Sequence, residues 1–137
     1  MVLKAKFAFS LALTPAILSP PAQAHHSFTA TYLADKTVIL DGTLSQFLFR
    51  NPHCSLLVDV KDSAGQVARW SIEWSGVGVL AESGINRSTL KPGDHVVVVA
   101  NPSRYPDEHR ARMISITRPQ DGWKWSAAKT SATLGGR

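Results

Sequence analysis

The stretch KTVILDGTLSQFLF, residues 36–49, decides the fold. It is rich in β-branched and aromatic residues, which favour a strand. Gly42 stands in its middle, where a residue without a side chain indicates a bulge or a sharp bend. The stretch ends at Arg50-Asn51-Pro52, which is a turn signal. We therefore expect one long, bent strand that serves both sides of a small barrel.

Short apolar segments separated by turn residues follow this strand. The sequence predicts strands over residues 54–61, 66–74, 95–100 and 111–118, with a short helix over residues 75–84. The alternation in the second of these strands places Trp70 and Trp74 on one face, where we expect them to pack in the core. This order predicts an all-β fold with one short helix, a small five-stranded OB-like Greek-key barrel. A small β-sandwich is the alternative.

The N-terminus has the pattern of an export signal. Lys4 and Lys6 precede an apolar run over residues 7–18, and Ala22-Gln23-Ala24 supplies a cleavage site. This run is too short to cross a bilayer, so a buried N-terminal helix is the alternative to a signal. We expect the following division of the chain: a signal peptide at residues 1–24, the barrel domain at 25–120 and a polar, flexible tail at 121–137. The mature protein is then periplasmic or secreted.

Composition limits the kinds of partner. Two of the 15 Lys and Arg residues lie in the predicted signal. The mature chain therefore has 13 Lys and Arg residues and 10 Asp and Glu residues, and its net charge falls from +5 to about +3. The basic residues are scattered and are not interleaved with aromatic residues, as they are in a groove for nucleic acid. The sequence therefore predicts no nucleic-acid partner and no membrane span. Cys54 is the only cysteine, and we expect it to be buried; a free thiol or a metal ligand is the alternative.

Three short motifs give the sequence a resemblance to a known family. They are His25-His26-Ser27-Phe28 after the predicted signal, Asn51-Pro52-His53 after the long strand, and Thr89-Leu90-Lys91-Pro92-Gly93-Asp94 before the strand at 95–100. With these motifs, residues 25–120 resemble a family of short exported bacterial proteins known only as a domain of unknown function. The resemblance implies export and a compact β-barrel, without an established activity. Cys54 departs from the family pattern, in which a nonpolar residue follows Asn-Pro-His.

The histidines are the strongest candidates for a chemical site. If the signal is cleaved after Ala24, His25 offers its α-amino group and its imidazole to one metal ion. His26 and His53 can complete a nitrogen-rich site, which suits copper or zinc. The segment from His25 to the barrel is long enough to reach the loop that holds His53. Ordinary structural roles for these histidines are the alternative.

The loops of the predicted barrel supply a second candidate site. In an OB-fold the loops after the first and fourth strands border the usual ligand face, so we expect Asn51, His53 and His109 to bind a ligand there. No motif with a nucleophile or with metalloprotease spacing is present, and the sequence predicts no catalytic residues. Two functions remain open, with a copper oxidase as a third. One is a periplasmic binding module for a small ligand, copper or zinc; the other is a structural module that docks onto another exported protein without a metal.

Overall fold

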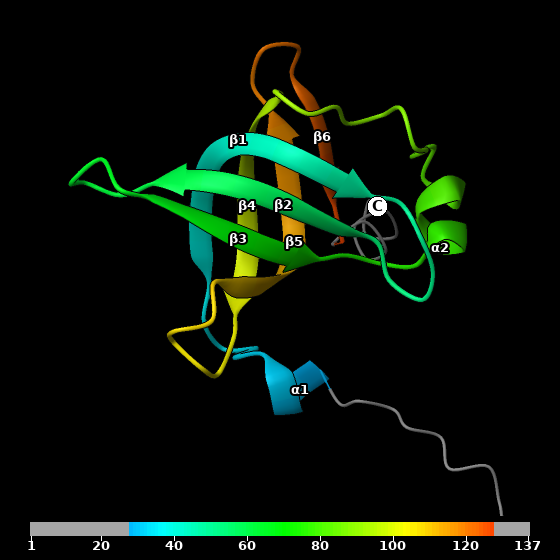
Figure 1. Cartoon of the computed structure of the whole chain (residues 1–137). Helices are drawn as coiled ribbons and strands as arrows, with labels where there is room; N and C mark the ends of the chain where they lie inside the picture. The colour runs from blue at the N-terminus through cyan, green and yellow to red at the C-terminus, as the bar shows by residue number, and fades with distance from the viewer. Residues whose placement is uncertain (1–27, 128–137) are drawn as a thin grey trace, which may run out of the picture.

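The computed structural model describes residues 28–127 and shows a single curved sheet with two short helices (Figure 1). In chain order its elements are α1 (Phe28–Thr31), β1 (Val38–Leu48), β2 (Ser55–Lys61), β3 (Val67–Glu73), α2 (Val77–Glu82), β4 (His95–Pro102), β5 (Arg110–Arg118) and β6 (Trp123–Ser126). The strands are ordered β3-β2-β1-β4-β5-β6. Because β3 also pairs with β5, the sheet closes into a five-stranded barrel with β6 as an extra strand.

The closure of the barrel depends on β1. Its first part pairs with β4 and its second part with β2, and Gly42 lies opposite both Val60 and Val96. A Cβ atom at residue 42 would lie only 2.4 Å from the backbone oxygen of Asp59. Glycine is therefore required where β1 passes from one partner to the other. The prediction of one long strand that serves both sides of the barrel is confirmed.

A short parallel pairing between β3 and β5 completes the barrel. The paired residues are Ser71 with Arg110, Ile72 with Ala111, and Glu73 with Arg112. All other neighbouring strands pair antiparallel. With α2 between β3 and β4, these pairings confirm the predicted OB-like barrel and exclude the β-sandwich. The parallel pairing also brings the end of β3 next to the start of β5.

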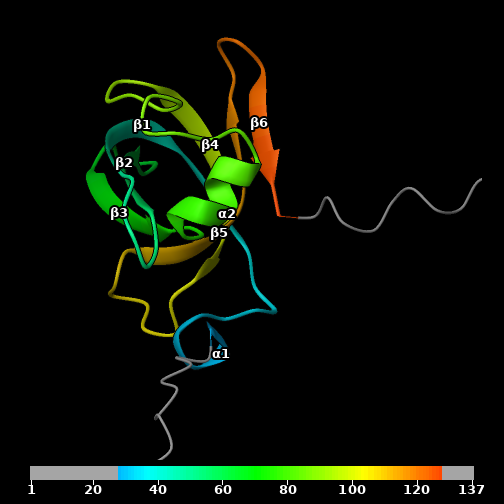
Figure 2. The same cartoon turned by 90° about the vertical axis from the view of Figure 1, so that its right-hand side faces the viewer.

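Apolar side chains from the five barrel strands and from α2 fill the interior. The buried cluster consists of Leu40, Leu44, Cys54, Leu56, Val58, Ile72, Trp74, Leu80, Ile85, Leu90, Val96, Val98, Ala100, Ala111, Met113 and Ile116. α2 lies across one end of the barrel, where Leu80 is fully buried (Figure 2). Trp74 is buried and Trp70 packs against the cluster while partly exposed, so both tryptophans face inward as predicted.

The structure contains two elements that the sequence did not predict, α1 and β6. β6 falls within residues 121–137, the expected tail, and pairs antiparallel with β5. It forms because Trp123 and Trp125 pack, partly buried, against the core cluster. Four residues are too few for a periodicity that would identify a strand. The rest of this tail, residues 128–137, and the predicted signal at residues 1–24 lie outside the described residues.

Replacement of Gly42 tests whether the close approach of β1 to β2 supports the fold. We expect Gly42→Ala to lower the free energy of unfolding by about 1–3 kcal/mol, because the new methyl group must displace the backbone at Asp59. Urea denaturation measures this loss. Gly78→Ala is the matched control, because nothing lies within 4 Å of where the new Cβ atom would be. Alanine in place of glycine in a helix raises the free energy of unfolding by up to about 1 kcal/mol. Equal stability of the two variants would contradict the role of Gly42.

Candidate functional site

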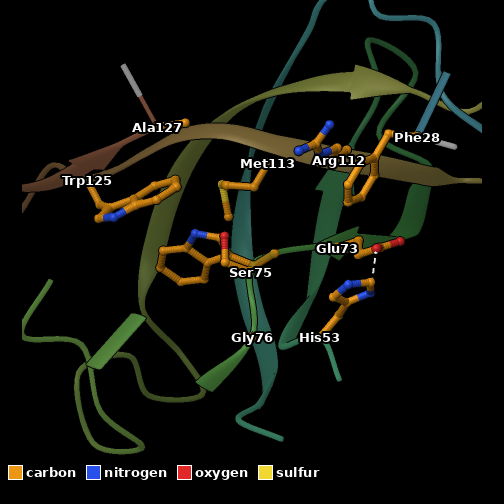
Figure 3. A pocket seen from close by; sticks show the side chains of 10 residues that line it. Phe28, His53, Glu73, Ser75, Gly76, Arg112, Met113, Trp125 and Ala127 are labelled. Carbon is orange, nitrogen blue, oxygen red and sulfur yellow. Dashed lines mark ion pairs between the residues drawn. The ribbon is translucent and has the colours of Figure 1, made fainter. Parts of the chain in front are cut away.

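The carboxylate of Glu73 joins three parts of the chain at one end of the barrel. Its Oε1 atom lies 2.8 Å from Nδ1 of His53, and its Oε2 atom accepts a hydrogen bond of 2.7 Å from the hydroxyl of Tyr32. Glu73 is the last residue of β3, His53 lies in the β1–β2 loop, and Tyr32 follows α1. Figure 3 shows His53 directed at the carboxylate. The site is therefore a hydrogen-bonded chain, His53–Glu73–Tyr32.

The β1–β2 loop is held in place by contacts with the start of α2. Its Asn51–Pro52 peptide bond is cis, and the side-chain oxygen of Asn51 accepts a 3.1 Å hydrogen bond from the backbone N–H of Val77. A Cβ atom at Gly76 would lie 2.8 Å from the backbone oxygen of Pro52. The close approach at Gly76 therefore fixes the loop that carries His53.

Tyr32 is buried and anchors the segment that precedes β1. The residue is 3% exposed, and its backbone forms an isolated antiparallel bridge with Ser103. Burial, together with the hydrogen bond to Glu73, raises the pKa of Tyr32 from 10.0 to about 12. The hydroxyl therefore keeps its proton well above neutral pH and donates a hydrogen bond to Glu73.

The contact with Glu73 decides which ring nitrogen of His53 is available to a ligand. The carboxylate is an acceptor, so the proton of a neutral His53 imidazole is placed on Nδ1. The other nitrogen, Nε2, then keeps its lone pair, and the ring is 47% exposed. Phe28 packs against this ring, with the two centroids 6.1 Å apart. His53 is thus an oriented, accessible nitrogen donor.

Two pockets flank the His53–Glu73 pair. The first measures about 290 Å³ and is lined by Phe28, His53, Glu73, Trp74, Ser75, Gly76, Arg112, Met113, Trp125 and Ala127 (Figure 3). The second measures about 390 Å³ and is lined by Tyr32, Arg50, Asn51, Pro52, His53, Cys54, Ser55, Ser71, Glu73 and Arg110. His53 therefore lines both pockets, together with one arginine in the first pocket and two in the second.

The structure separates the predicted ligand-binding residues. Asn51 and His53 line the second pocket, but the side chain of Asn51 is used to hold α2. His109 lines neither pocket and packs edge-on against Trp70, with centroids 5.2 Å apart. His25 and His26, the other predicted metal ligands, lie outside the described residues. Cys54 is fully buried as predicted, and burial raises the pKa of its thiol.

Sequence reasoning missed Tyr32, Glu73 and Arg112 as members of the site. Glu73 alternates with the inward-facing Trp70 and Trp74 and therefore resembles an ordinary exposed residue. The parallel register that sets it beside Arg112 joins residues far apart in the chain. Spacing within one segment carries no signal for such a contact.

The motifs of the sequence separate into two groups in space. Phe28, from the first motif, packs on His53, from the second, and so these two motifs meet at the site. The third motif lies elsewhere: Arg118 donates hydrogen bonds to the backbone oxygen of Thr89 and to the carboxylate of Asp94. The third motif thus forms a structural turn tied to β5.

These features define an OB-like barrel with an oriented histidine at one end. Residues 15–112 match a family of unknown function (DUF6152), and the chain belongs to this family. No curated protein matches the sequence significantly. Among solved structures, the chain is similar to the mitochondrial single-stranded DNA-binding protein Rim1 of S. cerevisiae, with 14% identity and a TM-score of 0.46. The similarity covers 60% of this chain and 92% of that one.

The prediction that excluded a nucleic-acid partner is wrong, because the structural neighbour is a protein that binds single-stranded DNA. The exclusion relied on the spacing of basic and aromatic residues along the chain, whereas a barrel gathers residues from separate strands onto one face. The likeness assigns no nucleic acid to this chain. Within residues 28–127, no helix has the length and hydropathy needed to span a membrane.

The raised pKa of Tyr32 gives a test of the hydrogen-bonded chain. In a Tyr105→Phe background, Tyr32 is the only tyrosine, and we expect its ultraviolet tyrosinate signal to appear near pH 12. Since this pKa lies above the ordinary 10.0, the stability linked to Tyr32 is present below pH 10 and is lost as the pH rises through 12. Glu73→Gln should lower the pKa only in part, because burial is the larger cause. Titration of folded Tyr32 near pH 10 would contradict the assignment.

Proposed function

We propose that the protein is a small binding module that holds copper or zinc, with His53 as a ligand. The observation that carries this proposal is the 2.8 Å contact between Nδ1 of His53 and the carboxylate of Glu73. A histidine that binds a metal through one ring nitrogen usually donates the other N–H to a carboxylate or carbonyl. Glu73 supplies that carboxylate and leaves Nε2 for the metal.

Tyr32 makes this arrangement more rigid than a surface ion pair. Its buried hydroxyl holds Oε2 of Glu73, so the carboxylate has a fixed position from which to orient His53. A comparison within the same barrel is His95, which contacts Asp41 at 2.6 Å. The side chain of Asp41 is 67% exposed, and no further hydrogen bond to its carboxylate is found in the described part of the chain. The orientation of His53 is therefore the better prepared for a ligand role.

The remaining ligands of this proposed site come from the N-terminal segment. Within residues 28–127, no three His, Cys, Asp or Glu side chains are grouped so that they could hold a metal ion. Phe28 packs on His53, and His25 and His26 precede Phe28 by three and two residues. Consecutive Cα atoms are about 3.8 Å apart, so both histidines have the reach to meet His53. Their imidazoles and the α-amino group freed by cleavage after Ala24 suit copper or zinc.

The proposal includes export, since only signal cleavage gives His25 a free α-amino group. Mass spectrometry of the protein recovered from the periplasm or the medium identifies the N-terminal residue. We expect His25 as the first residue. In copper- or zinc-containing medium, native mass spectrometry should show the ion retained. An N-terminus that includes residues 1–24 would overturn the α-amino chelate while leaving His53 to be tested separately.

Metal binding is tested by the melting temperature of tag-free protein that begins at His25. We expect Cu(II) or Zn(II) to raise it, because an ion that binds the folded state at 100 times its dissociation constant adds about 2.7 kcal/mol. His53→Ala should remove most of this shift. His95→Ala is the matched control, since it removes another half-exposed histidine with a carboxylate partner. If neither ion changes the melting temperature of the unmodified protein, the metal proposal fails and a metal-free interaction module is favoured.

The role of Glu73 is tested separately by calorimetric titration with the metal. We expect Glu73→Gln to weaken metal affinity about 10- to 100-fold, because a neutral amide accepts a weaker hydrogen bond from the His53 N–H than a charged carboxylate does. Asp41→Asn makes the same chemical change at the exposed pair and should leave the affinity unchanged. Equal effects of the two variants would show that Glu73 acts only through net charge.

A further inference from the structure

The 290 Å³ pocket beside His53 has two chemically different ends (Figure 3). One end carries the charged and polar groups of His53, Glu73 and Arg112. The other end carries the apolar side chains of Met113 and Trp125, as Figure 3 shows. A pocket with an apolar body and a few convergent polar groups is the usual form of a small-molecule site, and this volume lies near the lower limit for one.

Arg112 is a cation without a carboxylate partner in the described part of the chain. Its guanidinium carbon lies 3.5 Å from the centroid of the Phe28 ring, which holds the planar group by a cation–π contact. Three other arginines already pair with carboxylates, namely Arg69, Arg110 and Arg118. A guanidinium that lies over a ring still has N–H groups at its edge, which suit the two oxygens of a carboxylate.

Glu73 leaves the site open to an anion although it lies in the same pocket. Each of its carboxylate oxygens already has a donor, with His53 on Oε1 and Tyr32 on Oε2. Both oxygens of Glu73 are thus engaged by residues other than Arg112. No ion pair joins Glu73 and Arg112 in the described residues, even though the two are opposite each other in the β3–β5 register. The guanidinium therefore remains available to a ligand.

The apolar end is built from aromatic side chains. The rings of Trp74 and Trp125 meet edge to face, with centroids 5.0 Å apart, and Met113 belongs to the buried cluster beside them. The indole N–H of Trp74 is buried and has no acceptor among the described residues. These side chains form an apolar surface for the body of a ligand, together with a donor that the barrel itself does not satisfy.

We propose that this pocket binds a small organic carboxylate with an apolar body. Arg112 receives the carboxylate, and Trp74, Met113 and Trp125 contact the apolar part. The site stands independently of the metal proposal, because it uses Arg112 and the tryptophans and requires no ion on His53. The protein is then a binding module for a small acid as well as for a metal.

The test uses the purified protein after treatment with a chelator, so that no metal contributes. The probes are phenylacetate, its neutral analogue phenylacetamide, and acetate, which has the charge without the ring. We expect phenylacetate to bind about tenfold or more tightly than either of the others by calorimetric titration, because only phenylacetate satisfies both ends of the pocket. The indole N–H signals of Trp74 and Trp125 should shift in NMR spectra during the titration.

Matched arginine variants assign the contact. Arg112→Gln should weaken phenylacetate binding about tenfold or more, and Arg112→Lys, which keeps the positive charge, should weaken it less. Arg87→Gln is the control, because Arg87 also lies over a phenylalanine ring, 5.7 Å from the centroid of Phe49, but does not line the pocket. Melting temperatures close to that of the unmodified protein show that each variant is folded.

The outcomes separate this proposal from the metal proposal. Equal affinity for phenylacetate and phenylacetamide, equal effects of Arg112→Gln and Arg87→Gln, or no binding at millimolar phenylacetate would each overturn the carboxylate site. None of these results bears on metal binding, which is measured through His53 without an organic acid. Conversely, loss of phenylacetate binding in Arg112→Gln with an unchanged Cu(II) shift supports two independent uses of the same end of the barrel.

Discussion

The passage of β1 from β4 to β2 at Gly42 is the constraint on which the rest of the structure depends. A side chain at this position would meet the backbone of Asp59 in β2, so β1 and β2 come this close only around a glycine. Once β1 is shared between them, β3 and β5 are brought to the same seam and pair in parallel. That seam sets Glu73 beside Arg112. The chemistry at this end of the barrel is therefore a consequence of how the sheet closes.

Glu73 is the centre of the site because both of its oxygens are used. Tyr32 holds one oxygen from a buried position, and His53 holds the other from an exposed loop. A carboxylate constrained on one side orients the imidazole on its other side better than an exposed pair such as Asp41 and His95. The proposed metal site follows from this rigidity, whereas the proposed carboxylate site follows from the unpaired Arg112 that closure places next to it. The two proposals share a location but depend on different atoms.

The motifs near the N-terminus and after β1 gain a common explanation from the structure. Phe28 contacts both the ring of His53 and the guanidinium of Arg112, so the segment that enters the barrel covers the site it helps to form. The motif before β4 has a structural role, because Thr89 and Asp94 accept hydrogen bonds from Arg118 and stabilise a turn. The three motifs of this chain therefore divide into one group of residues that surrounds the candidate site and another that stabilises the fold.

The sequence by itself determined the five barrel strands, the glycine bend in the first of them, the helix before β4 and the inward direction of Trp70 and Trp74. These features depend on local spacing: alternation along a strand, a glycine within it, and turn residues at its ends. The sequence also made His53 a candidate site residue, because it stands in a recognisable turn. Only the tertiary structure decided that Glu73, Tyr32 and Arg112 surround it, that His109 packs on Trp70, and that β6 joins the sheet. These contacts join residues distant in the chain, and barrel closure brings them together through a strand register that no local pattern encodes.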